Sequence, residues 1–237
     1  MNRSFLQITI IINLTIHFMP GKSYANNIFP LPYEVFTDTL PEDQNLINGR
    51  VWQNLYSQIE GDQFLFSDQF LAGSVTTRGK KFEELRIRYD IFKDEIQIPY
   101  KPFGIIQVNK ELTDSFSLFF MNREYRFLRI SGSPDNEMNG YYNELYRGDT
   151  RLLVRYIKKI EKFADGGGND KFYLVNRIYL VRDGDFQIIR GKKDVFRFFS
   201  GEKNSIRNYI KRNKLKIIRD DAECYIPILK FVDSPAD

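Results

Sequence analysis

The stretch that decides the fold is FYLVNRIYLVRDGDFQIIR, residues 172–190. Two runs rich in aromatic and β-branched residues, Phe172–Val181 and Phe186–Arg190, flank the short segment Arg182-Asp183-Gly184-Asp185. An Asp-Gly pair between two such runs is typical of a tight hairpin, because the primed turn needs positive φ, which Gly adopts without strain. The pattern therefore predicts an antiparallel hairpin at this point of the chain.

Strand patterns continue upstream of this hairpin. Gly140–Arg147 and Thr150–Ile157 are again aromatic and β-branched, and the turn residues Gly148-Asp149 separate them. Before them, short runs alternate with turn residues at the spacing of an antiparallel sheet, and no helix-length amphipathic segment interrupts the series. We predict strands in the following runs: Phe64–Phe70, Gly73–Thr77, Phe82–Arg88, Glu95–Ile98, Ile105–Val108, Ser115–Phe120 and Tyr125–Ile130.

The spacing of the apolar residues changes after residue 190. Apolar side chains at i, i+3 and i+4 indicate two short helices: Val195, Phe198, Phe199 and Ile206, Tyr209, Ile210. Asp220-Asp221 can cap a last segment, in which Pro227 limits the helicity. We therefore predict a mainly β (α+β) fold. Residues 51–190 would form an antiparallel meander, sandwich or partly closed barrel, and residues 191–237 a basic segment of two to three short helices packed on it.

Residues 1–25 have the pattern of a signal peptide. Arg3 precedes the apolar run Phe5–Met19, and Ala25 is a small residue where a signal peptidase would cleave. The run is shorter than the ~20 apolar residues that a membrane span needs. We expect cleavage near Ala25, export to the periplasm or outer envelope, an extended arm at 26–50 and no transmembrane span in the mature chain.

The expected cleavage also limits the chemistry of the protein. The single histidine, His17, would leave with the signal peptide, and the single cysteine, Cys224, would remain. One cysteine cannot form an intramolecular disulfide, and without histidine there is no Ser–His or Cys–His catalytic pair and no Cys/His zinc site. We therefore predict no metal, no cofactor and no catalytic residue of these types.

A series of motifs along residues 64–232 resembles a protein family. The motifs are Gly73, Lys80-Lys81-Phe82, Leu85-Arg86-Ile87-Arg88-Tyr89-Asp90-Ile91-Phe92-Lys93-Asp94-Glu95, Asp183-Gly184, Lys192-Lys193-Asp194 and Ile210-Lys211-Arg212-Asn213-Lys214-Leu215-Lys216. In this order they resemble uncharacterised exported proteins that are common in the Bacteroidetes. The resemblance implies export to the periplasm or outer envelope, and it carries no activity. The Tyr-Tyr-Asn-Ser usual near the end of such proteins is replaced by Lys230-Phe231-Val232-Asp233-Ser234 here.

Positive charge is concentrated near the end of the chain. Residues 190–219 contain 11 Lys/Arg and 2 acidic residues, whereas the whole chain carries a net charge of only +4. A basic helical face can bind anionic lipid headgroups, glycans or an acidic protein surface, and the alternative is an ordinary solvated face. The residues that we predict to bind are Lys192, Lys193, Arg197, Lys203, Arg207, Lys211, Arg212 and Lys214.

Aromatic residues make up 15% of the chain, with 21 Phe, 14 Tyr and one Trp. Tyrosines on strands can line a pocket for a small apolar ligand, or they can pack against neighbours across the strands of a sheet, and the second is the more usual role. The candidate ligand-lining residues are Tyr141, Tyr142, Tyr146, Tyr173 and Tyr179.

Two further patterns suggest chemistry. Paired carboxylates can hydrolyse glycosides when they face each other across a cleft, and a set of them lies along one stretch: Glu83, Glu84, Asp90, Asp94 and Glu95. The alternative is that they are turn and surface carboxylates beside Arg86, Arg88 and Lys93. The loop Asp165–Phe172 matches most of a calcium-binding nonapeptide, but only one copy occurs, which favours a simple hairpin connection.

Taken together, these patterns favour an exported, non-catalytic envelope protein that acts as a binding or scaffolding module through its basic helices. Its partner would be an envelope protein or an anionic surface such as lipid headgroups or glycan, and the export signal argues against nucleic acid. The alternative is a periplasmic carrier that holds a lipid or other small apolar ligand in a β cavity. A carboxylate-based glycoside hydrolase is the third hypothesis.

Overall fold

The computed structural model describes residues 44–101, 104–131, 138–163 and 168–234. These residues belong to one compact unit of the chain, 36–237. The expected signal peptide, most of the expected arm and part of the glycine-rich loop lie outside the described residues. Within the described residues, no helix combines the length and the apolar character that crossing a membrane requires.

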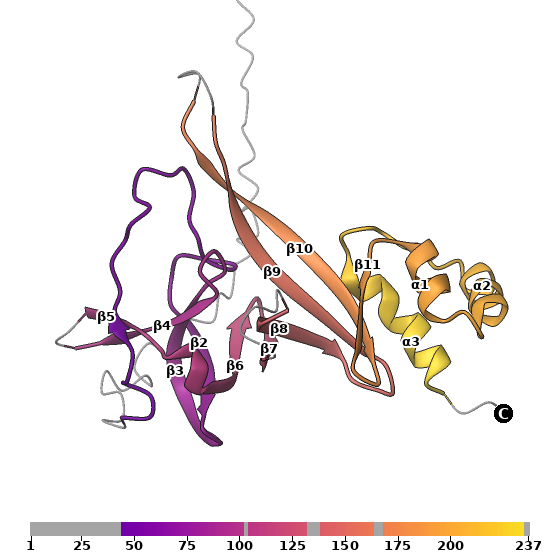
Figure 1. Cartoon of the computed structure of the whole chain (residues 1–237), viewed down its shortest axis with the longest axis horizontal. Coiled ribbons are helices and arrows are strands. Elements are labelled where there is room, and N and C mark those ends of the chain that lie inside the picture. The colour runs from indigo at the N-terminus through magenta and orange to yellow at the C-terminus, as the bar shows by residue number, and fades with distance from the viewer. Residues whose placement is uncertain (1–43, 102–103, 132–137, 164–167, 235–237) are drawn as a thin grey trace, which may run out of the picture. The chain divides into compact units, whose positions relative to one another are not determined.

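The described residues form one open antiparallel sheet, drawn in Figure 1 from indigo to orange. Its order is β1-β5-β4-β3-β2-β6-β7-β8-β9-β10-β11, so β1 and β11 are the edges. The bounds are β1 Arg50–Val51, β2 Leu71–Thr77, β3 Lys80–Asp90, β4 Glu95–Tyr100, β5 Gly104–Gln107, β6 Thr113–Phe120, β7 Arg123–Ile130, β8 Gly140–Tyr146, β9 Arg151–Glu161, β10 Lys171–Arg182 and β11 Asp185–Ile189. The predicted mainly β fold is confirmed, in the form of an open sheet in which two meanders, β2–β5 and β6–β11, are joined by the pairing of β2 with β6.

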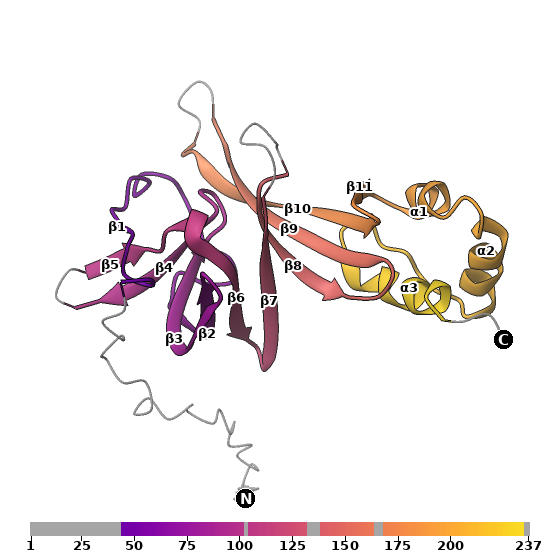
Figure 2. The same cartoon turned by 60° about the horizontal axis from the view of Figure 1, so that its bottom comes forward.

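The hairpin that decides the fold is the pair β10–β11. Asp183 and Gly184 have φ values of 52° and 82°, as a primed two-residue turn requires. On its other side β10 pairs with β9 over the whole length from Lys171 to Val181. The long β9–β10 pair therefore joins the earlier strands to the helical end of the chain (Figure 2).

Strand β3 contains a bulge that the simple alternation does not predict. Its register with β2 shifts between Gly73 and Val75, and Glu84 has a φ of 54°. The additional residue brings Phe82 onto the buried face together with Leu85 and Ile87. Phe82 thereby leaves the solvent-facing side of the strand.

One predicted strand, Phe64–Phe70, is wrong. Only Phe64 makes an isolated bridge, to Asp90, and the rest of the segment is irregular. Phe66 has a φ of 65° and its ring stacks on Phe120, with the centroids 4.7 Å apart. The aromatic residues of this segment therefore pack as separate side chains and do not line a strand face.

Two large clusters of buried residues stabilise the unit. The first lies among β2–β8 and contains Ile87, Tyr89, Phe116 and Phe127, and the second joins β9–β11 to the helices. Tyr156 of β9 packs against both. A third, smaller cluster contains Tyr142, Leu153, Tyr179 and Val181.

The helices pack at the β9–β11 end of the sheet. They are α1 (Lys192–Phe198), α2 (Lys203–Arg212) and α3 (Ile226–Val232), with short 3-10 turns η1 (Lys110–Leu112) and η2 (Ala222–Tyr225). Val195, Phe199, Ile206 and Ile210 share one buried cluster with Leu152, Val154, Ile178, Leu180 and Ile189, and within it α2 packs against α1 and α3. The two helices that we predicted from apolar spacing, and a third that begins around Pro227, therefore form at this end of the sheet (Figures 1 and 2).

Candidate functional site

The eight basic residues singled out from the sequence all lie on the helical end, and all eight are exposed. Lys192, Lys193 and Arg197 belong to α1, and Lys203, Arg207, Lys211 and Arg212 to α2, while Lys214 follows α2. The buried positions of these helices are Val195, Ile206 and Ile210. Because the apolar residues are buried in the second large cluster, the basic ones are directed to solvent. We call these eight residues the basic helical face.

Few acidic residues neutralise the basic helical face. Arg197 lies 3.5 Å from Asp194 in an i,i+3 pair, and the guanidinium of Arg207 stacks 5.5 Å from the ring centroid of Phe196. The six other residues make no ion pair within the described part of the chain. On α2 the positions of Lys203, Arg207 and Lys211 follow each other at i, i+4 and i+8, so their charges form one row beside the buried stripe.

The five candidate tyrosines do not come together around one cavity. Tyr141 lies in the first buried cluster, with its ring centroid 5.0 Å from that of Phe116 and 5.9 Å from that of Tyr89. Tyr142 and Tyr179 lie in the third cluster, 5.4 Å apart and edge to face. Adjacent residues of a strand point to opposite faces, which explains why Tyr141 and Tyr142 enter different clusters.

The two remaining tyrosines lie at the ends of their strands. Tyr146 is near Asp233, and burial followed by the hydrogen bond to this carboxylate raises the pKa of Tyr146. Tyr173 is 41% exposed on β10. Burial raises the pKa of Tyr142 to about 12 and that of Tyr141 further, so both stay protonated at neutral pH.

Hollows do occur on the described surface, with volumes of about 350 to 430 Å³. Of the five tyrosines, only Tyr146 lines one of these four hollows. Their walls mix apolar with charged residues such as Arg50, Glu95 and Arg126. The three buried tyrosines are thus occupied by ring packing, which gives the carrier hypothesis no geometric support.

The carboxylates separate into two groups. Glu83 and Glu84 are exposed near the start of β3, whereas Asp90, Asp94 and Glu95 lie at the β3–β4 turn. The register pairs Asp90 directly with Glu95. The structure therefore brings together three of the five carboxylates that the sequence suggested.

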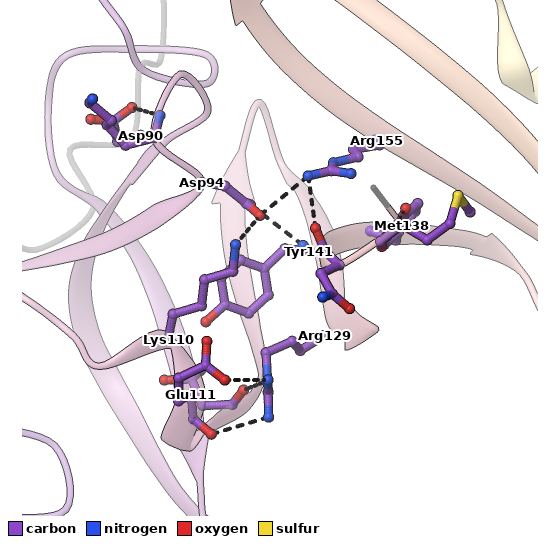
Figure 3. Close-up of polar contacts among 12 residues, drawn as sticks. Asp90, Asp94, Lys110, Glu111, Arg129, Met138, Tyr141 and Arg155 are labelled. Atoms are coloured by element: carbon purple, nitrogen blue, oxygen red, sulfur yellow. Dashed lines mark hydrogen bonds and ion pairs between the residues drawn. The ribbon is translucent and has the colours of Figure 1, made fainter. Parts of the chain in front are cut away.

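Asp94 is the centre of a polar network between β3, β8, β9 and η1 (Figure 3). Its carboxylate accepts hydrogen bonds from the hydroxyl of Tyr89, at 2.5 Å, and from the backbone N–H of Tyr141, at 3.4 Å. Lys110 forms an ion pair with the same carboxylate, and Arg155 lies 3.7 Å from it. The four partners come from positions far apart in the sequence, so Asp94 fixes the turn to the rest of the sheet.

A second arginine extends this network. Arg129 donates to the backbone carbonyls of Thr113 and Glu111, at 2.9 and 3.1 Å, and to the Glu111 carboxylate at 3.3 Å (Figure 3).

Burial, and then the charge of Asp94, raises the pKa of Tyr89 well above its usual value. Tyr89 therefore remains a hydrogen-bond donor to Asp94 at all ordinary pH values.

Asp90 and Glu95 are both engaged in hydrogen bonds. Asp90 accepts from the backbone N–H groups of Phe92 and Lys93 and from the amide of Gln63. Glu95 binds Arg50 at 2.7 Å and the side chain of Gln107. Burial raises the pKa of Asp90, and the nearby Glu95 adds to this effect.

This arrangement holds a turn in place more readily than it activates water. A general acid and a general base must each reach a substrate, but the oxygens of Asp90 and Glu95 already face protein donors. The carboxylates at the β3–β4 turn thus have a structural use in this protein.

The glycine-rich loop lies partly outside the described residues, at 164–167. Asp170, which is described, accepts a hydrogen bond from the backbone N–H of Phe163 at 3.1 Å. Among the described residues, no group of three or more His, Cys, Asp or Glu side chains is placed to hold a metal ion.

The surroundings of Arg88 were not predicted from the sequence. This arginine is 8% exposed, and its guanidinium lies 3.9, 4.7 and 4.9 Å from the ring centroids of Phe64, Phe70 and Trp52. It also donates two hydrogen bonds to Gln97. Burial lowers the pKa of Arg88. Arg88 gave no distinct signal in the sequence, because β3 contains several other charged residues, and the aromatic partners come from an irregular segment that no periodicity reveals.

A scan against protein-family models and searches of curated proteins and of solved structures find no match to this chain.

Proposed function

We propose that this chain is an exported, non-catalytic binding or scaffolding module of the cell envelope, and that the basic helical face contacts an acidic partner. The observation that supports this most directly is the charge on α1 and α2. Seven exposed cations lie on two short helices and Lys214 follows the second, and only Arg197 of the eight has a carboxylate partner among the described residues. The export and the envelope location rest on the sequence pattern of residues 1–25.

The packing of the helices supports a docking role. Ile206 and Ile210 are buried in the second large cluster, where α2 packs against α1 and α3, so the row of Lys203, Arg207 and Lys211 is presented on a packed support. Fixed charges of one sign attract an oppositely charged surface from a distance and accelerate association, and added salt weakens the attraction. A rigid basic row fits an acidic protein surface of the envelope better than it fits a buried substrate.

Charge reversal tests this proposal. The double substitution Arg207→Glu and Lys211→Glu changes two exposed positions of α2, and Lys159→Glu with Lys162→Glu is a matched control at two exposed lysines elsewhere. We expect partner proteins recovered with the wild type from its own envelope fraction to bind the α2 variant about tenfold more weakly, and the control nearly unchanged. Raising the salt from about 0.15 M to about 0.5 M should weaken wild-type binding as well.

Other results would redirect the assignment. Equal weakening by both double variants would mean that only net charge matters and that the basic helical face is not a specific site. A lipid-sized mass retained in native mass spectrometry would favour the carrier hypothesis. Release of reducing sugar from a glycan panel would favour the hydrolase, and loss of this activity in Asp90→Asn or Glu95→Gln would identify its carboxylates.

A further inference from the structure

A gap in the pairing of β10 opens one side of the sheet. β11 pairs with β10 only from Ile178 to Arg182. At the other end of β10, Glu60 takes the same side, since it donates to the carbonyl of Asp170 at 2.8 Å and accepts from the N–H of Phe172 at 3.0 Å. Between these two neighbours, residues 173–177 have no strand on this side within the described part of the chain. At about 3.3 Å per residue the gap spans roughly 17 Å, room for about five residues of an extended chain.

The hydrogen-bonding pattern shows which backbone groups face the gap. In an antiparallel pair the N–H and C=O groups of successive residues point alternately toward and away from the partner strand. The N–H of Phe172 points away from β9, because it binds Glu60. Leu174 and Asn176 have the same parity, so their N–H and C=O groups point into the gap. An added strand would find two donors and two acceptors there.

A hollow of about 410 Å³ adjoins the gap. Its walls are residues 175–178 of β10, residues 188–190 at the end of β11, and Arg219 and Asp220 ahead of η2. Ile188, which is 39% exposed, lines the hollow, and Leu174, which is 51% exposed, lies in the gap on the opposite face of the sheet. An extended segment laid along β10 places alternate side chains on both faces, so it would lie beside both of these side chains and the hollow.

The charge of the hollow indicates what kind of segment fits. Arg177, Arg190 and Arg219 line it, and none of their side chains has a carboxylate partner in the described residues, whereas Arg182 and Arg197 do. Asp220 is the single acidic residue in the lining. Arginine binds carboxylates through two parallel hydrogen bonds, so three arginines beside one aspartate favour an acidic ligand.

The backbone groups in the gap also point to a peptide. Leu174 and Asn176 present N–H donors and C=O acceptors at the regular spacing of a strand edge, and an extended peptide backbone carries complementary groups at the same spacing. A phosphate offers acceptors only, and a lipid headgroup has no such repeating series of donors and acceptors. From these observations we propose that the open edge of β10 binds an extended, acidic peptide segment of a partner protein by strand addition.

This inference goes beyond the basic helical face, since it depends on a sheet edge and on different side chains. The shortness of the gap is consistent with selective binding. Long open edges invite aggregation, and proteins blunt them by keeping them short or by charging them. Here Glu60 and β11 close the two ends, and Arg177 places a charge between them.

Alternating backbone methylation of a peptide provides the test. The probe is a fluorescent, acetylated peptide of alternating Asp and Val, and its Lys-Val counterpart is the charge control. Two further probes carry N-methyl groups on the odd or on the even residues, which removes the N–H groups of one side only. We expect the acidic peptide to bind the purified full-length protein, one methylated form to bind at least about tenfold more weakly and the other to bind nearly as well, because a strand pairs through one side. Fluorescence polarisation measures all four.

Variants place the peptide on the molecule. Asn176→Pro removes one outward N–H without breaking a bond to β9, and edge positions tolerate proline. Arg177→Glu with Arg219→Glu reverses two charges of the hollow. We expect each change to weaken the acidic peptide about tenfold or more, while the Arg207→Glu, Lys211→Glu double variant leaves it within about threefold. These variants thereby distinguish failure of the proposal for the basic helical face from failure of the proposal for the edge of β10.

Several outcomes would overturn the inference. Equal binding of both methylated peptides would exclude strand pairing, without any need for a protein variant. A second outcome is that inorganic phosphate or phosphatidylglycerol vesicles compete with the acidic peptide. If Arg177→Glu with Arg219→Glu abolished this competition while the two methylated peptides bound equally, the hollow would be a simple anion site. A self-dimer in sedimentation that Asn176→Pro abolishes, with no peptide bound, would assign the edge to a second copy of the chain.

Discussion

Replacing Asp94 with Asn should lower the free energy of unfolding by about 2 kcal/mol. Asn has the size of Asp and tolerates the positive φ of 59° at this position, so the change alters charge and leaves the backbone intact. One oxygen can still accept from Tyr89 and Tyr141. The other becomes an amide that presents hydrogens to Lys110 and Arg155, which are themselves donors.

The magnitude follows from the exposure of the pairs. Exposed ion pairs contribute up to about 1 kcal/mol, whereas removing one partner of a fully buried pair costs about 3–5 kcal/mol. The side chains of Asp94, Lys110 and Arg155 are 15%, 28% and 16% exposed, which places the network between the two cases. Arg155 keeps a hydrogen bond of 2.9 Å to the carbonyl of Asn139, so part of the network survives.

Urea denaturation at neutral pH measures the effect. With a slope near 2 kcal/mol/M, the midpoint should fall by about 1 M in Asp94→Asn. Lys110→Met should have little further effect when it is added to the Asp94→Asn variant, because its partner charge is already gone. Glu83→Gln is the control, since its pair with Lys81 is 66% and 57% exposed and should matter by less than about 0.5 kcal/mol. A loss below this value in Asp94→Asn, or full additivity with Lys110→Met, would refute the role assigned to Asp94.

Three further changes probe the turn, the bulge and the helices. Burial raises the pKa of Asp90, so the native state keeps this proton to a higher pH than the unfolded chain does, and the free energy of unfolding falls as the pH rises from about 4 to the raised pKa. Asp90→Asn does not titrate, so its stability relative to the wild type should increase from about pH 4 to pH 7 in urea titrations. A decrease in its relative stability over this range would contradict the assignment. A Cβ at Gly73 would lie 2.1 Å from the carbonyl oxygen of Ser117 on β6, so Gly73→Ala should cost at least about 2 kcal/mol by thermal unfolding, and an unchanged midpoint would mean that the strands can separate there. Ile206→Ala should lower the free energy of unfolding by about 3 kcal/mol. The unfolding midpoint followed by the fluorescence of Trp52, at the opposite end of the unit, should fall together with the midpoint followed by circular dichroism. Separate midpoints would show that the two large clusters unfold independently.

Local patterns predicted what depends on neighbours in the sequence. The turn at Asp183-Gly184 needs positive φ at two adjacent residues, and the apolar spacing of Ile206 and Ile210 defines a buried stripe whatever it packs on. The basic helical face was predictable for the same reason, because residues excluded from the stripe of a short surface helix must face solvent.

The alternation of apolar and polar residues along a strand does not show which other elements cover its faces. Tyr141 and Tyr142 could be assigned to opposite faces, yet their partners come from β3, β6, β10 and β11, far away in the sequence. The bulge at Glu84 moved Phe82 to the buried face, since one additional residue reverses the alternation. The network of Asp94 with Lys110 and Arg155 likewise depends on long-range pairing that a one-dimensional pattern does not contain.

The two proposed surfaces have different physical tasks, and kinetics can separate them. Exposed charges on α1 and α2 act at a distance, so their removal should mainly reduce the association rate and its dependence on salt. Backbone pairing along β10 and the desolvated arginine contacts form only after contact, so Asn176→Pro should mainly increase the dissociation rate. Arg190 and Arg219 bound the basic stretch that contains both helices and also line the hollow beside β10. A partner with an acidic extended segment would therefore be attracted by the helices and retained by the edge of β10. If the helix variants and the β10 variants changed the same rate constant, the two surfaces would form a single site.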